Sequence, residues 1–431
     1  MSRLILQGGR LLDPSTGQDE VGDLRVEGDR IVAHGRLTPV SGEQVLDTTG
    51  LVITPGFVDL CVHLREPGFD DVETIRSGAQ AALAGGFTAV AAMPDTEPPV
   101  DNVASATYLR FKGEKAGAAR VYPVGALTRG REGTHLSEMA GMESAGVVAF
   151  SDEENMVQRA EVFLRALRYA RMLHKPVLSR CEDLGLRGAG VANGGLMADL
   201  LGLPALAPGS EEIPVSRNLH LARMVGSPLH LLHLSSEESL NMVAEAKASG
   251  VQVTCSVTPQ HLMFTEEAIH DYDPLYKYFP PLRRESDRQA LIAGLHSGTV
   301  DAVSSAHAPR GEGEKNVEFV FAASGTGGLE VTFAVLYTQL VVKGHLDLER
   351  LIAALSTAPA RILGVPGGTL QVGSPADLTC LSLKESWRID PTRFLSRSST
   401  TPFAGWEVQG RPLHVIVGGQ VLYRDGKLVA N

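Results

Sequence analysis

Short hydrophobic runs recur along the middle of the chain, and most are followed by a stretch with helical spacing. Continuous apolar runs of this kind are typical of strands buried on both faces of a parallel sheet. Helical spacing is clearest over residues 73–84, 155–173 and 236–248. The alternation predicts an α/β fold, a (β/α)8 barrel with longer loops late in the chain. The eight runs are GFVDLCVHL, FTAVAAM, RVYPVGAL, GVVAFSD, PVLSRC, PLHLLHL, VQVTCSVT and VDAVSSA.

Both ends of the chain show a different pattern, in which apolar and polar residues alternate over short runs separated by glycine. It covers residues 4–53 and 373–429. Such alternation predicts small antiparallel strands, and we expect the two ends to pack together as one β-sandwich. The predicted domains are therefore residues 1–54 and 366–431, which share the sandwich, and residues 55–365, which form the barrel.

Composition narrows the classes of function. The chain has 431 residues, 43% hydrophobic and 21% charged, which is the balance of a globular protein with a large core. The net charge of −11, without any cluster of Lys and Arg, argues against nucleic acid as a partner. The four cysteines show no C-x-x-C spacing, which predicts reduced thiols. No apolar run has the length of a signal peptide or a membrane span, so we expect a soluble cytoplasmic protein.

Polar residues gather at the carboxyl ends of the predicted strands, where barrel enzymes place their sites. Cys61 and His63 lie two residues apart on the first strand, so their side chains share one face and could reach one metal ion. The residues at the strand ends are Cys61, His63, Arg65, Asp95, Asp152, Glu153, Arg180, Glu182, His233, Ala306 and His307.

A series of longer motifs runs through nearly the whole chain. They are PGFVDLCVHLREPG, AGGFTAVAAMPDTEPPVDN, GVVAFSD, HLLHLSS, VTPQHLMFTEE, PPLRRESDRQAL, HAPRGEGEKN and TPFAGWEVQGRP. In content and order they resemble the dihydroorotases of the amidohydrolase superfamily, specifically the longer bacterial type. The resemblance implies a role in pyrimidine biosynthesis, the reversible cyclisation of N-carbamoyl-aspartate to dihydroorotate at a zinc site. Allantoinases and dihydropyrimidinases share the fold but carry a metal-bridging lysine at the fourth strand, and VVAFSDEEN contains no lysine.

Several metal positions implied by the resemblance are altered. Cys61 stands where the family has the first histidine of a His-x-His pair, whereas His63 and the sixth-strand ligand His233 match. Arg180 replaces a histidine after the fifth strand. Ala306 replaces an aspartate that serves the family as metal ligand and general base.

The bridging and substrate positions also differ. After the fourth strand the family places a metal-bridging aspartate, and here either Asp152 or Glu153 takes that position. Arg65, which the resemblance assigns to the substrate carboxylate, is kept. Asp95 replaces an asparagine that shares this task, and Phe279 replaces another asparagine. An anion at Asp95 facing an anionic substrate is unfavourable.

The cost of these substitutions for metal binding and for the reaction rate can be estimated. A guanidinium stays protonated, and at about 4 Å it repels a divalent ion by roughly 8 kcal/mol at an effective dielectric constant of ~20. Loss of a general base costs ~10²–10⁴ in rate. We expect Arg180 to pair with Asp152, Glu153 or Asp95 and to fill the metal cavity with an ion-pair network.

Three hypotheses follow. The first is a catalytically inactive, dihydroorotase-like chain without cofactor, oligomeric and acting as a structural or regulatory partner of aspartate carbamoyltransferase. The second is an active dihydroorotase with an atypical site of one zinc ion. The third is a small-molecule binding protein that uses Arg65 in the old pocket. The sequence changes favour the first. The ligands of the second would be Cys61, His63, Glu153 and His233.

Overall fold

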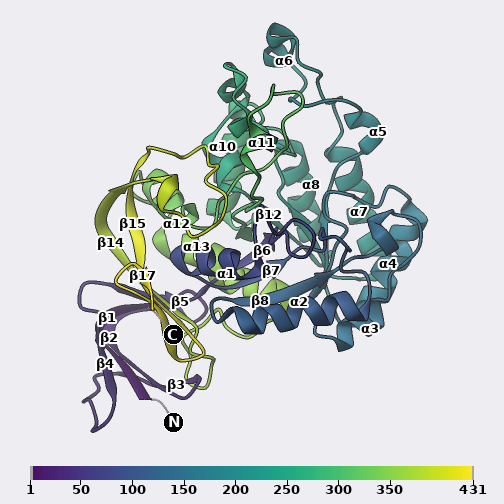
Figure 1. Ribbon diagram of the computed structural model, residues 1–431. Coiled ribbons are helices and arrows are strands. Elements are labelled where there is room, and N and C mark those ends of the chain that lie inside the picture. Colours follow the sequence, from purple (N-terminus) through teal and green to yellow (C-terminus); the bar gives the residue numbers. More distant parts are fainter. Residues whose placement is uncertain (1–2, 430–431) are drawn as a thin grey trace.

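A computed structural model describes residues 3–429, and its centre is a parallel eight-stranded barrel (Figure 1). Neighbouring strands follow the chain order from β6 to β13. A parallel bridge between Val62 and His307 links the first strand to the segment that follows the last. This confirms the predicted barrel. Its strands are β6 (Phe57–Val62), β7 (Phe87–Ala92), β8 (Arg120–Gly125), β9 (Ala149–Phe150), β10 (Val177–Arg180), β11 (Leu229–Leu232), β12 (Val253–Val257) and β13 (Ala302–Val303).

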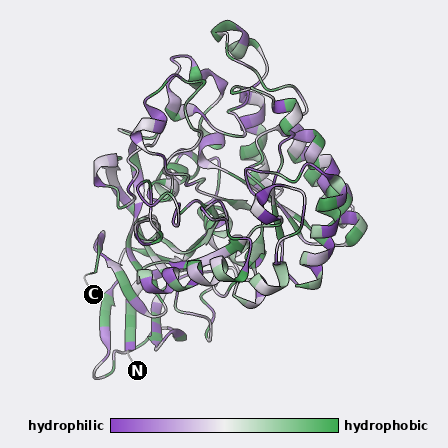
Figure 2. Ribbon diagram, turned by 45° about the vertical axis from the view of Figure 1, so that its right-hand side comes forward, coloured by the Kyte–Doolittle hydropathy of each residue, from purple (hydrophilic) through white to green (hydrophobic). Residues whose placement is uncertain are grey.

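Helices surround this barrel, and those in Figure 2 carry both hydrophobic and hydrophilic residues, as expected for helices with one face on a core. The α-helices are α1 (Ile75–Ala84), α2 (Val103–Ala116), α3 (Met139–Ser144), α4 (Ala160–Met172), α5 (Leu184–Arg187), α6 (Leu196–Leu201), α7 (Glu212–Val225), α8 (Glu237–Ala248), α9 (Pro259–Met263), α10 (Glu285–Ser297), α11 (Glu312–Lys315), α12 (Thr332–Leu336), α13 (Leu348–Ile352) and α14 (Ala358–Leu363). Short 3-10 or π segments are η1 (Arg129–Arg131), η2 (Glu266–Ile269), η3 (Pro274–Tyr276), η4 (Tyr337–Val341), η5 (Ala353–Thr357) and η6 (Pro391–Arg393). None of the helices in the described part of the chain is long and apolar enough to cross a membrane.

The helix starts follow local chemistry. Thr74 and Ser236 cap α1 and α8 because each side chain accepts a hydrogen bond from a backbone N–H three residues on. Helix α4 begins later than the sequence pattern predicts. The preceding loop is held instead by Arg217, which donates hydrogen bonds to the carbonyl oxygens of Val157 and Gln158.

The two chain ends meet in one nine-stranded sheet beside the barrel, in keeping with the expectation that they pack together (Figure 1). Strands β5 and β14 pair antiparallel and join the two ends, with Pro55 opposite Leu378. The predicted domain boundaries after residues 54 and 365 stay predictions. The strands are β1 (Arg3–Asp13), β2 (Gln18–Glu27), β3 (Arg30–Gly35), β4 (Gln44–Asp47), β5 (Val52–Pro55), β14 (Leu378–Arg388), β15 (Glu407–Val417), β16 (Gln420–Arg424) and β17 (Lys427–Leu428).

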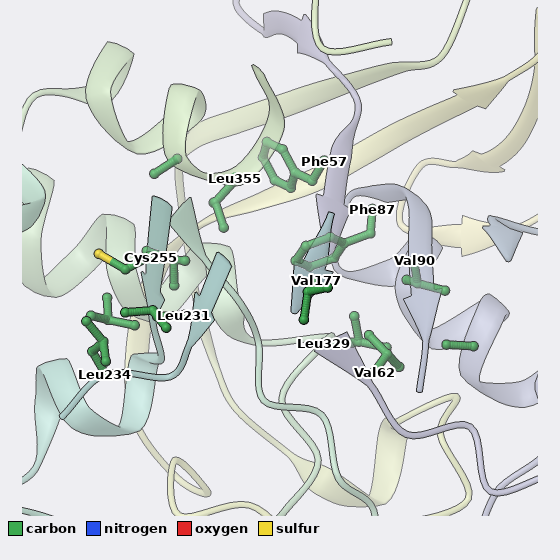
Figure 3. Packing of buried hydrophobic residues seen from close by; sticks show 14 of the residues in the cluster. Phe57, Val62, Phe87, Val90, Val177, Leu231, Leu234, Cys255, Leu329 and Leu355 are labelled. Carbon is green, nitrogen blue, oxygen red and sulfur yellow. The ribbon is translucent and has the colours of Figure 1, made fainter. Parts of the chain in front are cut away.

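Aromatic and aliphatic side chains fill the space between the barrel strands and the surrounding elements (Figure 3). Phe57 of β6 packs against Phe87 of β7 with ring centroids 5.7 Å apart, and against Phe333 of α12 at 5.5 Å. All three rings are buried. Their burial stabilises the base of the barrel and leaves the opposite, carboxyl end of the strands free for polar groups.

A loop after β14 returns to the barrel and meets Glu330, a partly buried acid. The backbone N–H groups of Leu395 and Ser396 donate to Glu330 at 2.9 and 3.0 Å, and the Ser396 hydroxyl donates to Glu73. Burial raises the pKa of Glu330 to about 8, against the opposing effect of these hydrogen bonds. Glu330 is therefore largely protonated at neutral pH.

We expect Glu330→Gln to stabilise the protein at alkaline pH. The native carboxyl has a raised pKa in the folded state, so stability is complete below the unfolded pKa and is lost as pH rises toward about 8. The glutamine variant cannot ionise, and its advantage should reach about 2–4 kcal/mol near pH 9 and vanish near pH 4. Urea denaturation of both proteins across this range measures the difference. An advantage that did not depend on pH would contradict the protonated state of Glu330.

Candidate functional site

Four of the predicted site residues adopt an unusual backbone conformation at the ends of their strands. Arg65, Glu153, His233 and Ala306 have φ angles of 62°, 44°, 55° and 52°. Residues other than glycine adopt this left-handed region at an energetic cost, and such residues cluster at functional sites. The strained turns lie at the carboxyl end of the barrel, where the sequence pattern places the site.

Three potential metal ligands from different strands converge in this mouth. The Cys61 sulfur, a Glu153 carboxylate oxygen and a His233 ring nitrogen all lie within 4.8 Å of one another, and the three residues are buried. Within residues 3–429, Glu153 Oε2 and His233 Nε2 have no hydrogen-bond partner. Buried polar atoms are rarely left without a partner, so these two indicate space for a bound group.

The charges around this cluster are mixed, because the acids favour a bound cation and the Arg180 guanidinium opposes it. Burial and the nearby Glu153 carboxylate raise the pKa of the Cys61 thiol well above its usual value. Burial and the positive charge of Arg180 lower the pKa of His233, which leaves its imidazole neutral, the form that binds metals. A metal ion would stabilise the Cys61 thiolate, since metal binding releases the thiol proton.

A second group links His63, Arg65 and Asp95. His63 Nδ1 and Arg65 Nη1 each lie 2.7 Å from Asp95 Oδ2. Burial raises the pKa of Asp95, but its interactions with His63 and Arg65 outweigh this effect and hold the pKa far below the usual value. The Asp95 carboxylate is therefore engaged by two partners, which offsets the repulsion of an anionic substrate anticipated from the sequence. His63 Nε2 lies 3.8 Å from Glu153 and so borders the three-residue cluster.

Arg180 forms ion pairs with two acids of the mouth. Its Nη1 lies 3.3 Å from Glu153 Oε1 and 3.5 Å from Glu154 Oε1. Of the three partners anticipated for Arg180, the structure shows Glu153. Asp152 turns away and accepts hydrogen bonds from Leu127 N at 2.8 Å and from Thr128. Glu153, not Asp152, is thus the acid that faces the mouth.

Two contributors were not identified from the sequence. Glu154 pairs with Arg180 and lies 3.9 Å from Arg310 Nη2. The sequence features that point to Glu154 and Arg310 are the run of three acids in SDEEN and the arginine three residues after His307. Ala306 brings only a methyl group to its strand end. Its neighbour His307 instead contacts Glu73, with 3.5 Å between Nε2 and Oε2.

The barrel, with acidic, histidine and cysteine side chains at its mouth, places the protein among the amidohydrolases. The sequence matches the Amidohydrolase family over residues 215–422 and the Dihydro-orotase-like family over residues 50–239. The structure is similar to L-hydantoinase (dihydropyrimidinase) from Arthrobacter aurescens, with a TM-score of 0.89, 25% identity and coverage of 100% of this chain and 98% of that one.

Full-length relatives define the family more narrowly. A dihydroorotase of Geobacter metallireducens is 43% identical, covering 98% of this chain and 99% of the relative. A dihydroorotase of Pelotomaculum thermopropionicum is 42% identical with the same coverage. The chain belongs to the dihydroorotase family.

These comparisons bear on the hypotheses drawn from the sequence. Relatives that span the whole chain and are named dihydroorotase favour the active alternative over the inactive one. The expectation that the chain is not an enzyme finds no support in them. The roles predicted for individual residues, and the association with aspartate carbamoyltransferase, stay predictions.

Proposed function

We propose that the chain is a slow dihydroorotase with a single metal position, which interconverts N-carbamoyl-aspartate and dihydroorotate in pyrimidine biosynthesis. The observation that carries the proposal is the convergence of Cys61, Glu153 and His233 from three strands, with two buried atoms left without partners. The family relationship indicates the reaction. The cluster of Cys61, Glu153 and His233 is the site at which we expect it to occur.

The donor set fits zinc. Thiolate sulfur, imidazole nitrogen and carboxylate oxygen are all zinc ligands, and catalytic zinc sites use three protein ligands with one position open. A zinc ion held by Cys61, Glu153 and His233 would supply Lewis-acid polarisation of the amide carbonyl. A second metal ion is opposed because the Arg180 guanidinium lies 3.3 Å from Glu153 Oε1, whereas Glu153 Oε2 has no partner within residues 3–429 and stays available to the single zinc.

Arg65 is the group that we expect to bind the substrate carboxylate. Its Nη1 is committed to Asp95, and its Nε donates to the Pro309 carbonyl oxygen at 3.3 Å. The buried Nη2 has no partner within residues 3–429. Hydrogen bonds to Asp95 and Pro309 thus hold the guanidinium in place and leave one N–H edge for a carboxylate oxygen.

Proton transfer and metal binding are weakened together, because the aspartate that Ala306 replaces serves the family as both general base and metal ligand. Ala306 cannot accept a proton from the attacking water or return it to the leaving amide nitrogen. The loss of a positioned general base lowers the rate by ~10²–10⁴. The proposed enzyme is therefore slow compared with a family member that keeps an aspartate at this position.

Zinc analysis combined with a dihydroorotate assay tests the proposal. We expect about one zinc ion per chain and a turnover ~10²–10⁴ below that of a member with the full ligand set. His233→Ala should remove the zinc and the residual turnover together, because it deletes one of three ligands. His230→Ala is the matched control, since His230 lies on the same strand and bonds Thr254 and Ser256 instead.

A second candidate function is favoured by a different observation. The Arg180 ion pairs and the methyl group of Ala306 suit a chain whose fold is retained for binding another protein, not for catalysis. Such a chain would act as a non-catalytic partner of aspartate carbamoyltransferase. Absence of both zinc and turnover in the native chain would favour this candidate. Co-elution of the two proteins in gel filtration, unchanged by Arg65→Ala, would then support it.

A further inference from the structure

A second cavity lies outside the barrel mouth, between the terminal sheet and the barrel. Its volume is about 670 Å³. Its walls come from the end of β14, the middle of β15, β16, the turn around η6 and Glu330. Strand β15 packs beside α12 (Figure 1). Small-molecule sites in proteins have volumes of about 300–1,000 Å³, so this cavity has the size to hold one ligand.

Arginines dominate the charge of this cavity. Arg388, Arg393 and Arg411 line it. Arg411 pairs with Glu385 at 3.0 Å, whereas Arg388 donates its Nε to the Gly405 carbonyl oxygen at 3.2 Å. Within residues 3–429 neither Arg388 nor Arg393 forms an ion pair with a carboxylate at 4 Å or less. The cavity therefore presents guanidinium groups with unused hydrogen-bond donors.

Hydrogen bonds from Thr392 and the charges of Arg393 and Arg388 lower the pKa of Asp390, which lines the same cavity, so its carboxylate offsets part of the positive charge. The Asp390 side chain accepts hydrogen bonds from the backbone N–H and the hydroxyl of Thr392, the latter at 2.7 Å. Glu330 faces the same cavity, and its burial raises its pKa to about 8. A protonated Glu330 carries no charge at neutral pH and has an O–H to donate. The cavity thus combines positive charge with a neutral hydrogen-bond donor.

Aromatic side chains form the rest of the wall. Trp387, Phe394 and Tyr423 line the cavity. The indole of Trp387 is held by a hydrogen bond of 3.1 Å to the Gly410 carbonyl oxygen, and the Arg411 guanidinium lies 5.8 Å from its ring centroid. A fixed, partly exposed aromatic ring provides a face on which a planar ligand ring can stack.

We propose that this cavity binds an organic phosphate that carries a planar ring, such as a nucleoside monophosphate. Arg388 and Arg393 bind the phosphate, because planar guanidinium groups match phosphate oxygens with two parallel hydrogen bonds. Trp387 stacks on the ring, and Glu330 donates a hydrogen bond to an acceptor atom of the ring, either a carbonyl oxygen or a ring nitrogen. The site is separate from the barrel mouth and does not depend on the proposed dihydroorotase activity.

Tryptophan fluorescence provides a direct test, since the chain has only two tryptophans. In a Trp406→Phe variant, Trp387 is the remaining one, and titration with uridine or adenosine 5′-monophosphate should quench it to saturation. Inorganic phosphate and the free nucleosides should bind at least about tenfold more weakly, because each lacks one half of the contacts. Calorimetric titration of the native chain gives the same affinities without the substitution.

Substitution of the arginines identifies the phosphate contacts. Arg388→Ala combined with Arg393→Ala should weaken binding of the nucleoside monophosphate by about tenfold or more. Both arginines are exposed, so the variant should fold, and circular dichroism verifies this. Arg168→Ala, an exposed arginine on α4, is the matched control and should leave the affinity unchanged. The proposal is overturned by an absence of saturable binding at millimolar ligand, by an unchanged affinity in the double variant, or by equally tight binding of inorganic phosphate.

Discussion

Arg180→Met, compared with the native chain in the presence of a chelator, should lower the free energy of unfolding by about 3–5 kcal/mol. The guanidinium is buried and lies 3.3 Å from Glu153, which is buried as well. Removing it leaves a carboxylate without its countercharge in a site of low dielectric, which costs far more than the loss of a surface ion pair. The chelator excludes zinc, which would otherwise supply a substitute charge. Urea denaturation followed by circular dichroism measures the change.

Two control variants separate charge from packing. Arg180→Met combined with Glu153→Gln should recover most of the lost stability, because replacing both partners of a buried pair removes the unpaired charge. Arg168→Met, on the exposed face of α4, should stay within about 0.5 kcal/mol of the native chain. An Arg180→Met variant as stable as the native chain would show that the Arg180 ion pairs contribute little and that its guanidinium is free to leave the metal cavity.

Restoring the family ligands together should raise dihydroorotate turnover by ~10²–10⁴ or more. The triple variant Cys61→His, Arg180→His and Ala306→Asp replaces the repelling guanidinium with a ligand and returns a proton acceptor to the eighth strand. It should bind two zinc ions per chain where the native protein binds one. Elemental analysis and a steady-state assay with dihydroorotate measure both effects on the same preparation.

The intermediate variants show which change matters. Ala306→Asp alone should leave turnover near the native level, because Arg180 still opposes a second metal ion. Cys61→His with Arg180→His should gain the second zinc without the full rate, since the proton acceptor is absent. High turnover in the single Ala306→Asp variant would contradict this account and would show that one metal position and a base suffice.

Local patterns were enough to predict the architecture. Strands such as GFVDLCVHL and PLHLLHL are apolar throughout because both faces of each are covered, and this signal does not depend on distant residues. The same holds for helix starts at Thr74 and Ser236, where one side chain binds a nearby backbone N–H. The carboxyl-end rule for barrels also predicts that Cys61 and His233 lie at the mouth.

Local sequence patterns therefore account for the barrel, the β structure at both chain ends and the strand ends that carry polar groups. Which of these groups meet depends on the packing of the folded chain. It brought Glu153 rather than Asp152 to the mouth, because the backbone turns at a positive φ there and Asp152 is held by Leu127 and Thr128. It also paired Arg180 with Glu153 and Glu154. Such contacts join different strands, and their distances depend on packing across the whole barrel, which no local pattern records.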